Sequence, residues 1–236
     1  MNFNRIMSYL NERLDEWRES EGFKGEAYKS SFNIAVMGGA IVSLLRDEEV
    51  NDIDIFFKNE HDKILVTNSI KPDSIEVVTD NAITLKSGIQ IITRFCGNVG
   101  YIVKGFDFVH TQITYDVMKG EIKPLNQNVL ECILTKELEY ISNDHPISSL
   151  LRAFKYIKRG WSINPGHIFK ICLDISELDL LNPSVLAEQF IGIDLTYFSD
   201  LIESVEDGNA KTFDGISALL DDLMNRPISV DEENLF

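Results

Sequence analysis

The chain has 236 residues, 44% of them hydrophobic, which is typical of a globular protein with one large or two small domains. Thirty-eight acidic residues against 22 basic ones give a net charge of −16. Such a charge disfavours nonspecific attraction to nucleic acid and to anionic membrane surfaces, so any contact with nucleic acid has to use a local basic patch.

The cysteines and the apolar segments bear on location. Cys96, Cys132 and Cys172 are far apart and form no C-x-x-C pair, so buried, reduced thiols in a cytoplasmic protein are expected. The N-terminus lacks the basic and apolar regions of a signal peptide, and the longest apolar run, residues 34–45, is too short to span a bilayer. The expected location is the cytoplasm, or the host cytoplasm if the chain is phage-encoded, without a membrane partner.

The N-terminal third predicts a helix followed by a strand and a glycine turn. Apolar residues at helical spacing indicate an amphipathic helix over residues 3–18 that packs against a sheet. After a polar linker, residues 32–37 are typical of a strand that breaks at Gly38 and Gly39, where the missing Cβ lets backbone amides approach a ligand. Residues 40–47 favour a short helix, whose positive N-terminus would attract an anion such as a triphosphate.

The next predicted strand, residues 52–57, carries two acids. A period of two places Asp52 and Asp54 on the same face. Two carboxylates this close beside large apolar residues repel each other and lose solvation unless a cation lies between them, and their hard oxygen atoms suit Mg²⁺ or Mn²⁺. An EF-hand is excluded because the loop glycine is missing and Ile64 stands where its last glutamate should be.

Further strands are predicted downstream. Residues 61–69 favour a short helix, and residues 74–78, 82–85 and 90–95 are typical of strands separated by turns. The run from 32 to 115 therefore predicts a small mixed sheet with flanking helices.

The second half is predicted to be helical. Residues 144–146, 164–165 and 182–183 each combine a capping residue with a proline, which predicts the starts of three helices. Gly160 and Gly192 are expected to end helices, and the chain finishes in an acidic tail of residues 231–236.

The first of these helices has two distinct sides. Its apolar stripe consists of Ile147, Leu150, Leu151, Phe154, Ile157 and Trp161. The opposite side carries Arg152, Lys155 and Arg159, which we call the basic set. Charges opposite an apolar stripe are usually a solvated surface, but in a chain this acidic the basic set is also a candidate phosphate site, and both interpretations stay open.

Gly38, Gly39, Asp52 and Asp54 together resemble the signature of the DNA polymerase β-like nucleotidyltransferase superfamily, a glycine turn, a short helix and Asp-x-Asp on the next strand. The resemblance implies a third carboxylate on a later strand, and Asp107, between aromatic residues in a strand-like run, is the candidate. More narrowly, the chain is similar to nucleotidyltransferase-like proteins of tailed bacteriophages. The segments that carry this similarity are residues 91–95, 106–110 and 148–152.

The resemblance implies a nucleotidyltransferase-like catalytic domain, residues 1–120. With the helical signals of the second half, the expected fold is α+β, with this domain followed by a helical domain, residues 121–236. The resemblance also implies transfer of a nucleoside monophosphate from an NTP such as ATP to an acceptor hydroxyl, with release of pyrophosphate and with Mg²⁺ or Mn²⁺ as cofactor. Asp52, Asp54 and Asp107 would be the catalytic and metal-binding residues. The expected nucleotide-binding residues are Gly38, Gly39, Ser43, Arg152, Lys155 and Arg159. The acceptor stays open among an RNA 3′ end, a protein side chain and a small molecule.

Two alternatives compete with this hypothesis. The fold could serve as a nucleotide- or protein-binding module without turnover, although an idle site has no physical reason to hold mutually repulsive carboxylates. A glycosyltransferase could also use Asp-x-Asp, but several strand-helix units would then precede Asp52, and only one strand does. His110 is out of phase with Asp107, so it is expected to be a packed histidine rather than a ligand.

Overall fold

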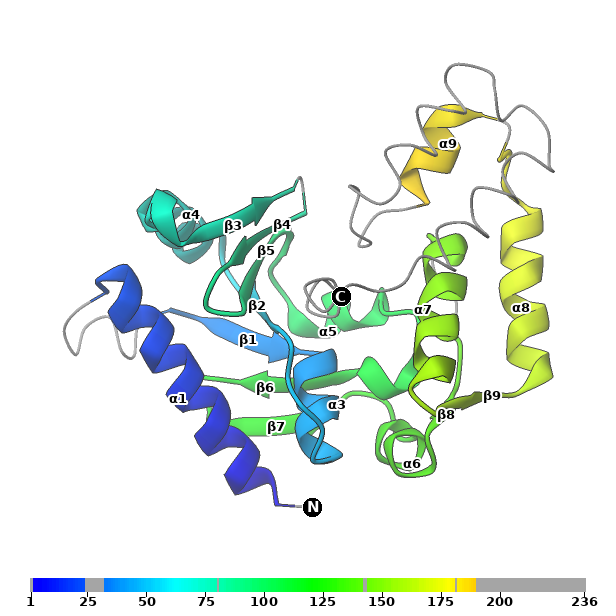
Figure 1. Cartoon of the computed structure of the whole chain (residues 1–236), viewed down its shortest axis with the longest axis horizontal. Helices are drawn as coiled ribbons and strands as arrows, with labels where there is room; N and C mark the ends of the chain where they lie inside the picture. Colours follow the sequence, from blue (N-terminus) through cyan, green and yellow to red (C-terminus); the bar gives the residue numbers. More distant parts are fainter. Residues whose placement is uncertain (1, 24–31, 80, 142–143, 181, 190–236) are drawn as a thin grey trace. The chain divides into compact units, whose positions relative to one another are not determined.

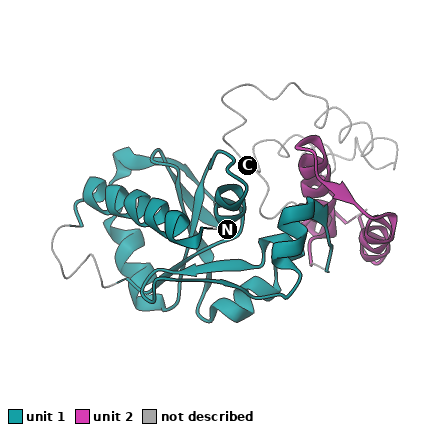
Figure 2. Ribbon diagram, turned by 90° about the horizontal axis from the view of Figure 1, so that it is seen from below, with its two compact units in different colours: residues 1–141 teal, residues 142–236 magenta. Residues whose placement is uncertain are grey.

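The computed structural model describes residues 2–23, 32–79, 81–141, 144–180 and 182–189. The chain divides into two compact units, residues 1–141 and 142–236 (Figure 2).

The first unit is built on a sheet that has, within the described residues, seven strands in the order β3-β4-β5-β2-β1-β6-β7 (Figure 1). The strands are β1 (Ile34–Met37), β2 (Ile53–Phe57), β3 (Ile75–Val78), β4 (Ala82–Leu85), β5 (Ile89–Cys96), β6 (Ile113–Asp116) and β7 (Glu121–Pro124). Neighbouring strands pair antiparallel except β2 and β5, which are parallel. The predicted mixed sheet is confirmed.

Helices flank this sheet and make up most of the described second unit. Those of the first unit are α1 (Phe3–Glu21), α3 (Gly39–Leu45), α4 (Glu60–Ser69), α5 (Val99–Lys104) and α6 (Val129–Thr135), with short 3₁₀ helices η1 (Pro72–Ser74) and η2 (Val109–Thr111) and the short strand β8 (Glu137–Leu138). Those of the second unit are α7 (Pro146–Lys158), α8 (Pro165–Ser176) and α9 (Pro183–Glu188), with the short strand β9 (Ser162–Ile163). The α+β fold class is therefore as predicted.

The two faces of the sheet are covered differently. Ala35 of β1 and Phe56 of β2 are paired in register, so they point to the same face, where they pack with Val103 of α5. Tyr115 of β6 points to the other face, and its hydroxyl donates a hydrogen bond to Oδ1 of Asn11 in α1 at 2.7 Å. The face with Phe56 is therefore the one that also carries Asp54, and α1 covers the opposite face.

The predicted amphipathic helix is confirmed as α1. Its residues Ile6, Leu10, Leu14 and Trp17 are all at most 4% exposed. They recur at three- and four-residue spacing, which places them on one side of a helix and explains why this side packs on the sheet.

The helix starts of the second unit largely follow the prediction. Asn164 caps α8 by accepting a hydrogen bond from the amide of Gly166 at 2.9 Å, and the Asn182 side chain accepts one from Ser184 at the start of α9. Helix α7 begins at Pro146, but its N-cap is His145, with no side-chain cap hydrogen bond.

The apolar stripe predicted for α7 is only partly buried. Phe154 and Ile157 are 46% and 39% exposed, whereas Ser148 and Ser149 are completely buried. The Ser148 hydroxyl donates a hydrogen bond to the carbonyl of Gln189, which compensates the cost of burying a polar group. The stripe therefore lies on one side of a helix, as its spacing predicts, but hydrophobic periodicity alone does not identify the buried serines of α7.

The unit boundary differs from the one predicted at residue 120. The first unit continues to Ile141 because β7 pairs with β6 along residues 121–124. The predicted acidic tail and Gly192 lie outside the described residues. Of the cysteines, all unpaired, Cys132 is buried as expected but Cys172 is exposed. Within the described residues no helix combines the length and apolar character needed to cross a membrane.

Candidate active site

The glycine turn joins β1 to α3 as the sequence predicted. Gly38 has φ +78° and ψ −130°, and its amide donates to the carbonyl of Ile113 at 3.2 Å, which fixes the turn against β6. A Cβ on Gly38 would lie 3.5 Å from the ring of Phe106. Gly39 is exposed, and a Cβ there would meet no atom within 4 Å. The turn is therefore fixed on its inner side and open on its outer side.

The two acids lie at the start of β2, and Asp54 points to the face that α5 covers. Strand β2 begins at Ile53, immediately after Asp52, and Asp54 shares its face with Phe56. Oδ1 of Asp54 is out of contact with solvent and has no hydrogen-bond partner among the described residues. The pKa of Asp54 is raised well above its usual value, mainly by burial and in addition by the charge of Asp52.

This pair fits a divalent cation. A buried carboxylate oxygen without a hydrogen-bond partner in the described residues carries a desolvation cost that a bound cation would offset. Asp52 and Asp54 repel each other, but both would attract a cation placed between them. Carboxylate oxygens suit Mg²⁺ and Mn²⁺. However, in the described residues no three Asp, Glu, His or Cys side chains gather closely enough to hold a metal ion. The structure therefore pairs Asp52 and Asp54 but does not add Asp107 to them.

Asp107 lies in a bend between α5 and η2, so its predicted place on a strand was wrong. The bend is held by an isolated bridge between Phe108 and Tyr140 and by the amide of Ile141, which donates to the Asp107 carbonyl at 2.9 Å. Asp107 is 6% exposed. Burial lowers the pKa of His110 to about 3, although the nearby charge of Asp107 acts in the opposite direction. His110 is fully buried, as expected of a packed histidine.

The other predicted nucleotide-binding residues belong to two elements. Ser43 is partly exposed and follows Gly39 by four residues in α3, so the two lie on the same side of that helix. Arg152 and Lys155 are three residues apart in α7 and partly buried, and Arg159 is exposed as its C-cap. The basic set thus lies within the second unit, along one side of α7 and at its end.

One residue of the carboxylate face was not predicted. Gln90 of β5 is paired in parallel register with Asp54, so it points to the same face beside the acid. Its Nε2 donates to Oγ1 of Thr84 at 3.0 Å, which fixes the amide. The available signal was a single polar residue in the apolar run Ile89–Ile92.

Comparison with solved structures identifies the fold. The structure is similar to Thermotoga maritima CCA-adding enzyme complexed with tRNA, with a TM-score of 0.52 and 14% identity, over 75% of this chain and 46% of that one. It is also similar to a tRNA-processing enzyme in apo form I, with a TM-score of 0.51 and 14% identity, over 91% of this chain and 59% of that one. The fold is therefore that of the DNA polymerase β-like nucleotidyltransferases.

The family follows from the sequence comparison. Residues 2–136 match the Gabija anti-defense 2 family protein, and the chain belongs to that family. It is 24% identical to Gabija anti-defense 2 of Bacillus phage SPbetaL7 over 244 residues, which cover 98% of this chain and 58% of the phage protein. The chain thus spans less than two thirds of the length of these relatives.

Proposed function

We propose that this chain is a metal-dependent nucleotidyltransferase that moves a nucleoside monophosphate from an NTP to an acceptor hydroxyl and releases pyrophosphate. The observation that carries the proposal is the buried Oδ1 of Asp54, which has no hydrogen-bond partner in the part of the chain that the structure describes. Burial and the charge of Asp52 raise the pKa of this residue. Without a cation, two neighbouring carboxylates at a buried position destabilise the folded state. A site for Mg²⁺ or Mn²⁺ requires such carboxylates as ligands.

Each residue near the glycine turn has a proposed task. Asp52 and Asp54 hold the divalent cation, which when bound neutralises phosphate charge and makes an acceptor hydroxyl easier to deprotonate. Because Gly39 has no side chain and no atom lies within 4 Å of the place of a Cβ, the triphosphate could approach the backbone there. Ser43 lies on the same side of α3 as Gly39. Gln90 is a candidate to contact the nucleotide, because it shares the face of Asp54.

Asp107 and the basic set are proposed to complete the reaction. Phe106 packs against Phe56 at 6.2 Å between ring centroids and borders Gly38, so Asp107 directly follows a residue that contacts the turn. Its proposed task is to accept the proton of the acceptor hydroxyl as that oxygen attacks the α-phosphorus. The basic set is proposed to bind the phosphates of the nucleotide or of the acceptor.

The acceptor is proposed to belong to the host cell's defence machinery, either a protein or an RNA. The family name supports a host defence system as the target, and the CCA-adding enzyme in complex with tRNA has the same fold. Attaching a nucleotide adds a charged group to a target and can block the surface that carries it.

The proposal is tested with labelled nucleotides. The purified chain is incubated with each α-³²P-labelled NTP, with Mg²⁺ or Mn²⁺, and with an extract of host cells that carry the defence system. We expect labelled protein or RNA with the parent chain and none with the variant Asp52→Asn/Asp54→Asn. Absence of label in every fraction, or equal labelling by the variant, would contradict the proposal.

A further inference from the structure

The turn between β4 and β5 supports the segment that carries Asp52. The amide of Ile53 donates a hydrogen bond to the carbonyl of Gly88 at 2.9 Å. Gly88 has φ +77°, and a Cβ on it would lie only 3.3 Å from the carbonyl oxygen of Asn51. The turn therefore contacts the residues on both sides of Asp52, and a shift of the turn would shift the first acid of the pair.

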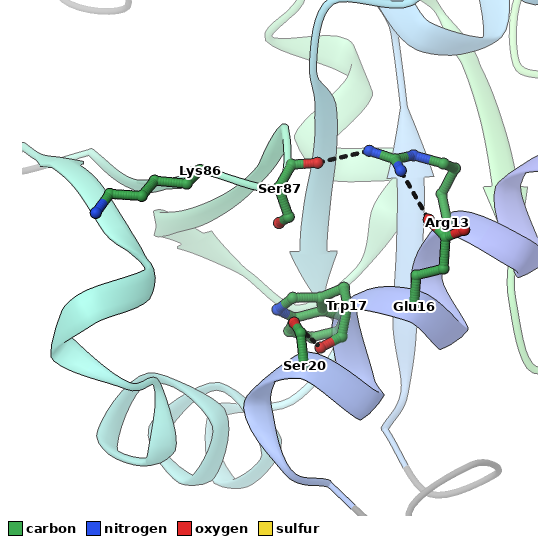
Figure 3. Close-up of a pocket in the computed structure, with 6 residues that line it drawn as sticks. All are labelled: Arg13, Glu16, Trp17, Ser20, Lys86 and Ser87. Atoms are coloured by element: carbon green, nitrogen blue, oxygen red, sulfur yellow. Dashed lines mark hydrogen bonds and ion pairs between the residues drawn. The ribbon is translucent and has the colours of Figure 1, made fainter.

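Helix α1 holds this turn through one arginine. Nη2 of Arg13 donates to the carbonyl of Ser87 at 2.6 Å, across 74 positions of the sequence. Nη1 of Arg13 pairs with Glu16 at 2.7 Å, one turn along the same helix (Figure 3). The pair with Glu16 orients the guanidinium, so that its second nitrogen points to the turn.

A cavity adjoins the bond between α1 and the turn. A cavity of about 330 Å³ lies here, lined by Arg13, Glu16, Trp17, Ser20, Lys86 and Ser87. The hydroxyl of Ser87 and the indole nitrogen of Trp17 have no hydrogen-bond partner in the described part of the chain, and Lys86 extends away from Arg13 in Figure 3. The hydrogen bond from Arg13 therefore holds the turn from the side of α1, while the amide of Lys86, which donates to the carbonyl of Ser74 at 3.0 Å, also holds it.

We propose that Arg13 is a positioning residue for Asp52, acting through the carbonyl of Ser87 and the turn at Gly88. This inference rests on the proposed function, in which Asp52 binds the divalent cation. Residues that orient metal ligands without touching the metal commonly change metal affinity when they are replaced. Arg13 is one step further from the ligand, because it holds the turn that contacts the residues on both sides of Asp52.

Two measurements on the full chain test the proposal. In Arg13→Ala we expect Mn²⁺ affinity to fall by about 10-fold or more, with partial recovery in Arg13→Lys, which keeps one donor. Hydrogen exchange of the Ile53 amide should become faster, since its acceptor at Gly88 is no longer held. The matched control is Arg5→Ala, which removes an exposed arginine of the same helix that pairs with Asp47 at 2.6 Å, and both quantities should stay unchanged.

A double-mutant cycle separates positioning from general weakening of the fold. If Arg13 acts through Asp52, Arg13→Ala should have no further effect on Mn²⁺ affinity in an Asp52→Asn background. An equal loss in both backgrounds, or unchanged exchange at Ile53, would overturn the inference. If the parent binds no Mn²⁺, the proposed function fails, and the exchange at Ile53 still decides whether Arg13 holds this segment.

Discussion

Replacing Asp54 by Asn should stabilise the protein in the absence of metal. Burial and the charge of Asp52 raise the pKa of Asp54 in the folded state, so ionising this residue at neutral pH opposes folding. Asn keeps the shape and removes the charge. Each pKa unit of the shift corresponds to about 1.4 kcal/mol. In a chain of this size, each 1 kcal/mol gained in the free energy of unfolding raises the melting temperature by roughly 2–4 °C.

The advantage of the variant should depend on pH. Because the folded-state pKa of Asp54 lies above the unfolded value, its protonation stabilises the parent fully below the unfolded pKa of about 3.9. That contribution is lost as the pH rises through the folded-state value. The difference in melting temperature between Asp54→Asn and the parent should therefore be present at pH 7 and vanish toward acid pH, as followed by calorimetry.

Metal should reverse the order of stability. Mn²⁺ at 100 times its dissociation constant would stabilise the parent by about 2.7 kcal/mol, whereas Asp54→Asn should gain little.

The matched control is Asp116→Asn on β6. Burial raises the pKa of Asp116. The hydrogen bond from Lys58, at 2.6 Å, together with the other hydrogen bonds and charges, outweighs the effect of burial and holds this pKa below its usual value. Asp116→Asn should therefore lower stability at pH 7, with the loss fading toward acid pH. The reasoning is refuted if Asp54→Asn is less stable than the parent without metal, or if Mn²⁺ stabilises the parent and Asp54→Asn equally.

Three further predictions concern the turn, the basic set and the third acid. Gly39→Ala should leave the melting temperature unchanged but weaken NTP binding in a titration, because its methyl would enter the open space of the turn, whereas Gly38→Ala should cost about 1–2 kcal/mol of stability because of its positive φ. Changing each member of the basic set to Ala should weaken nucleotide or acceptor binding, and the loss should shrink at high salt; unchanged affinities would make this side of α7 a solvated surface. Asp107→Asn should lower turnover at least ~10²-fold with a smaller loss of metal-NTP affinity, and an undiminished rate would remove Asp107 from the reaction.

Local sequence patterns are sufficient to predict the glycine turn and the strand that carries Asp54. The glycines that end β1 and the strand that carries Asp54 depend only on residues close in sequence, and the structure has both, with the charge of Asp52 acting on Asp54. Strand β7 was missed because its four residues include Pro124 and alternate between exposed and partly buried positions, as suits the edge of a sheet.

Long-range pairing explains the errors and omissions. The aromatic residues that flank Asp107 predict a strand, but Gly105 ends α5 just before it, and Tyr140 and Ile141 fix the bend. Gln90 could not be placed beside Asp54 without knowing that β2 and β5 are parallel neighbours. The bond between Arg13 and the turn likewise joins two segments whose proximity no local pattern encodes.

The central claim is nucleotidyl transfer, and the position of the transferred phosphorus tests it most directly. Parallel reactions with the same NTP, labelled either at the α- or at the γ-phosphorus, should be run with Mn²⁺ and the host extract, and pyrophosphate should be measured in both. The account predicts covalent label on an acceptor from the α-labelled NTP alone, with one pyrophosphate released for each label attached. Label from the γ-phosphorus, or no label with the parent chain under conditions in which Mn²⁺ and NTP are bound, would contradict it.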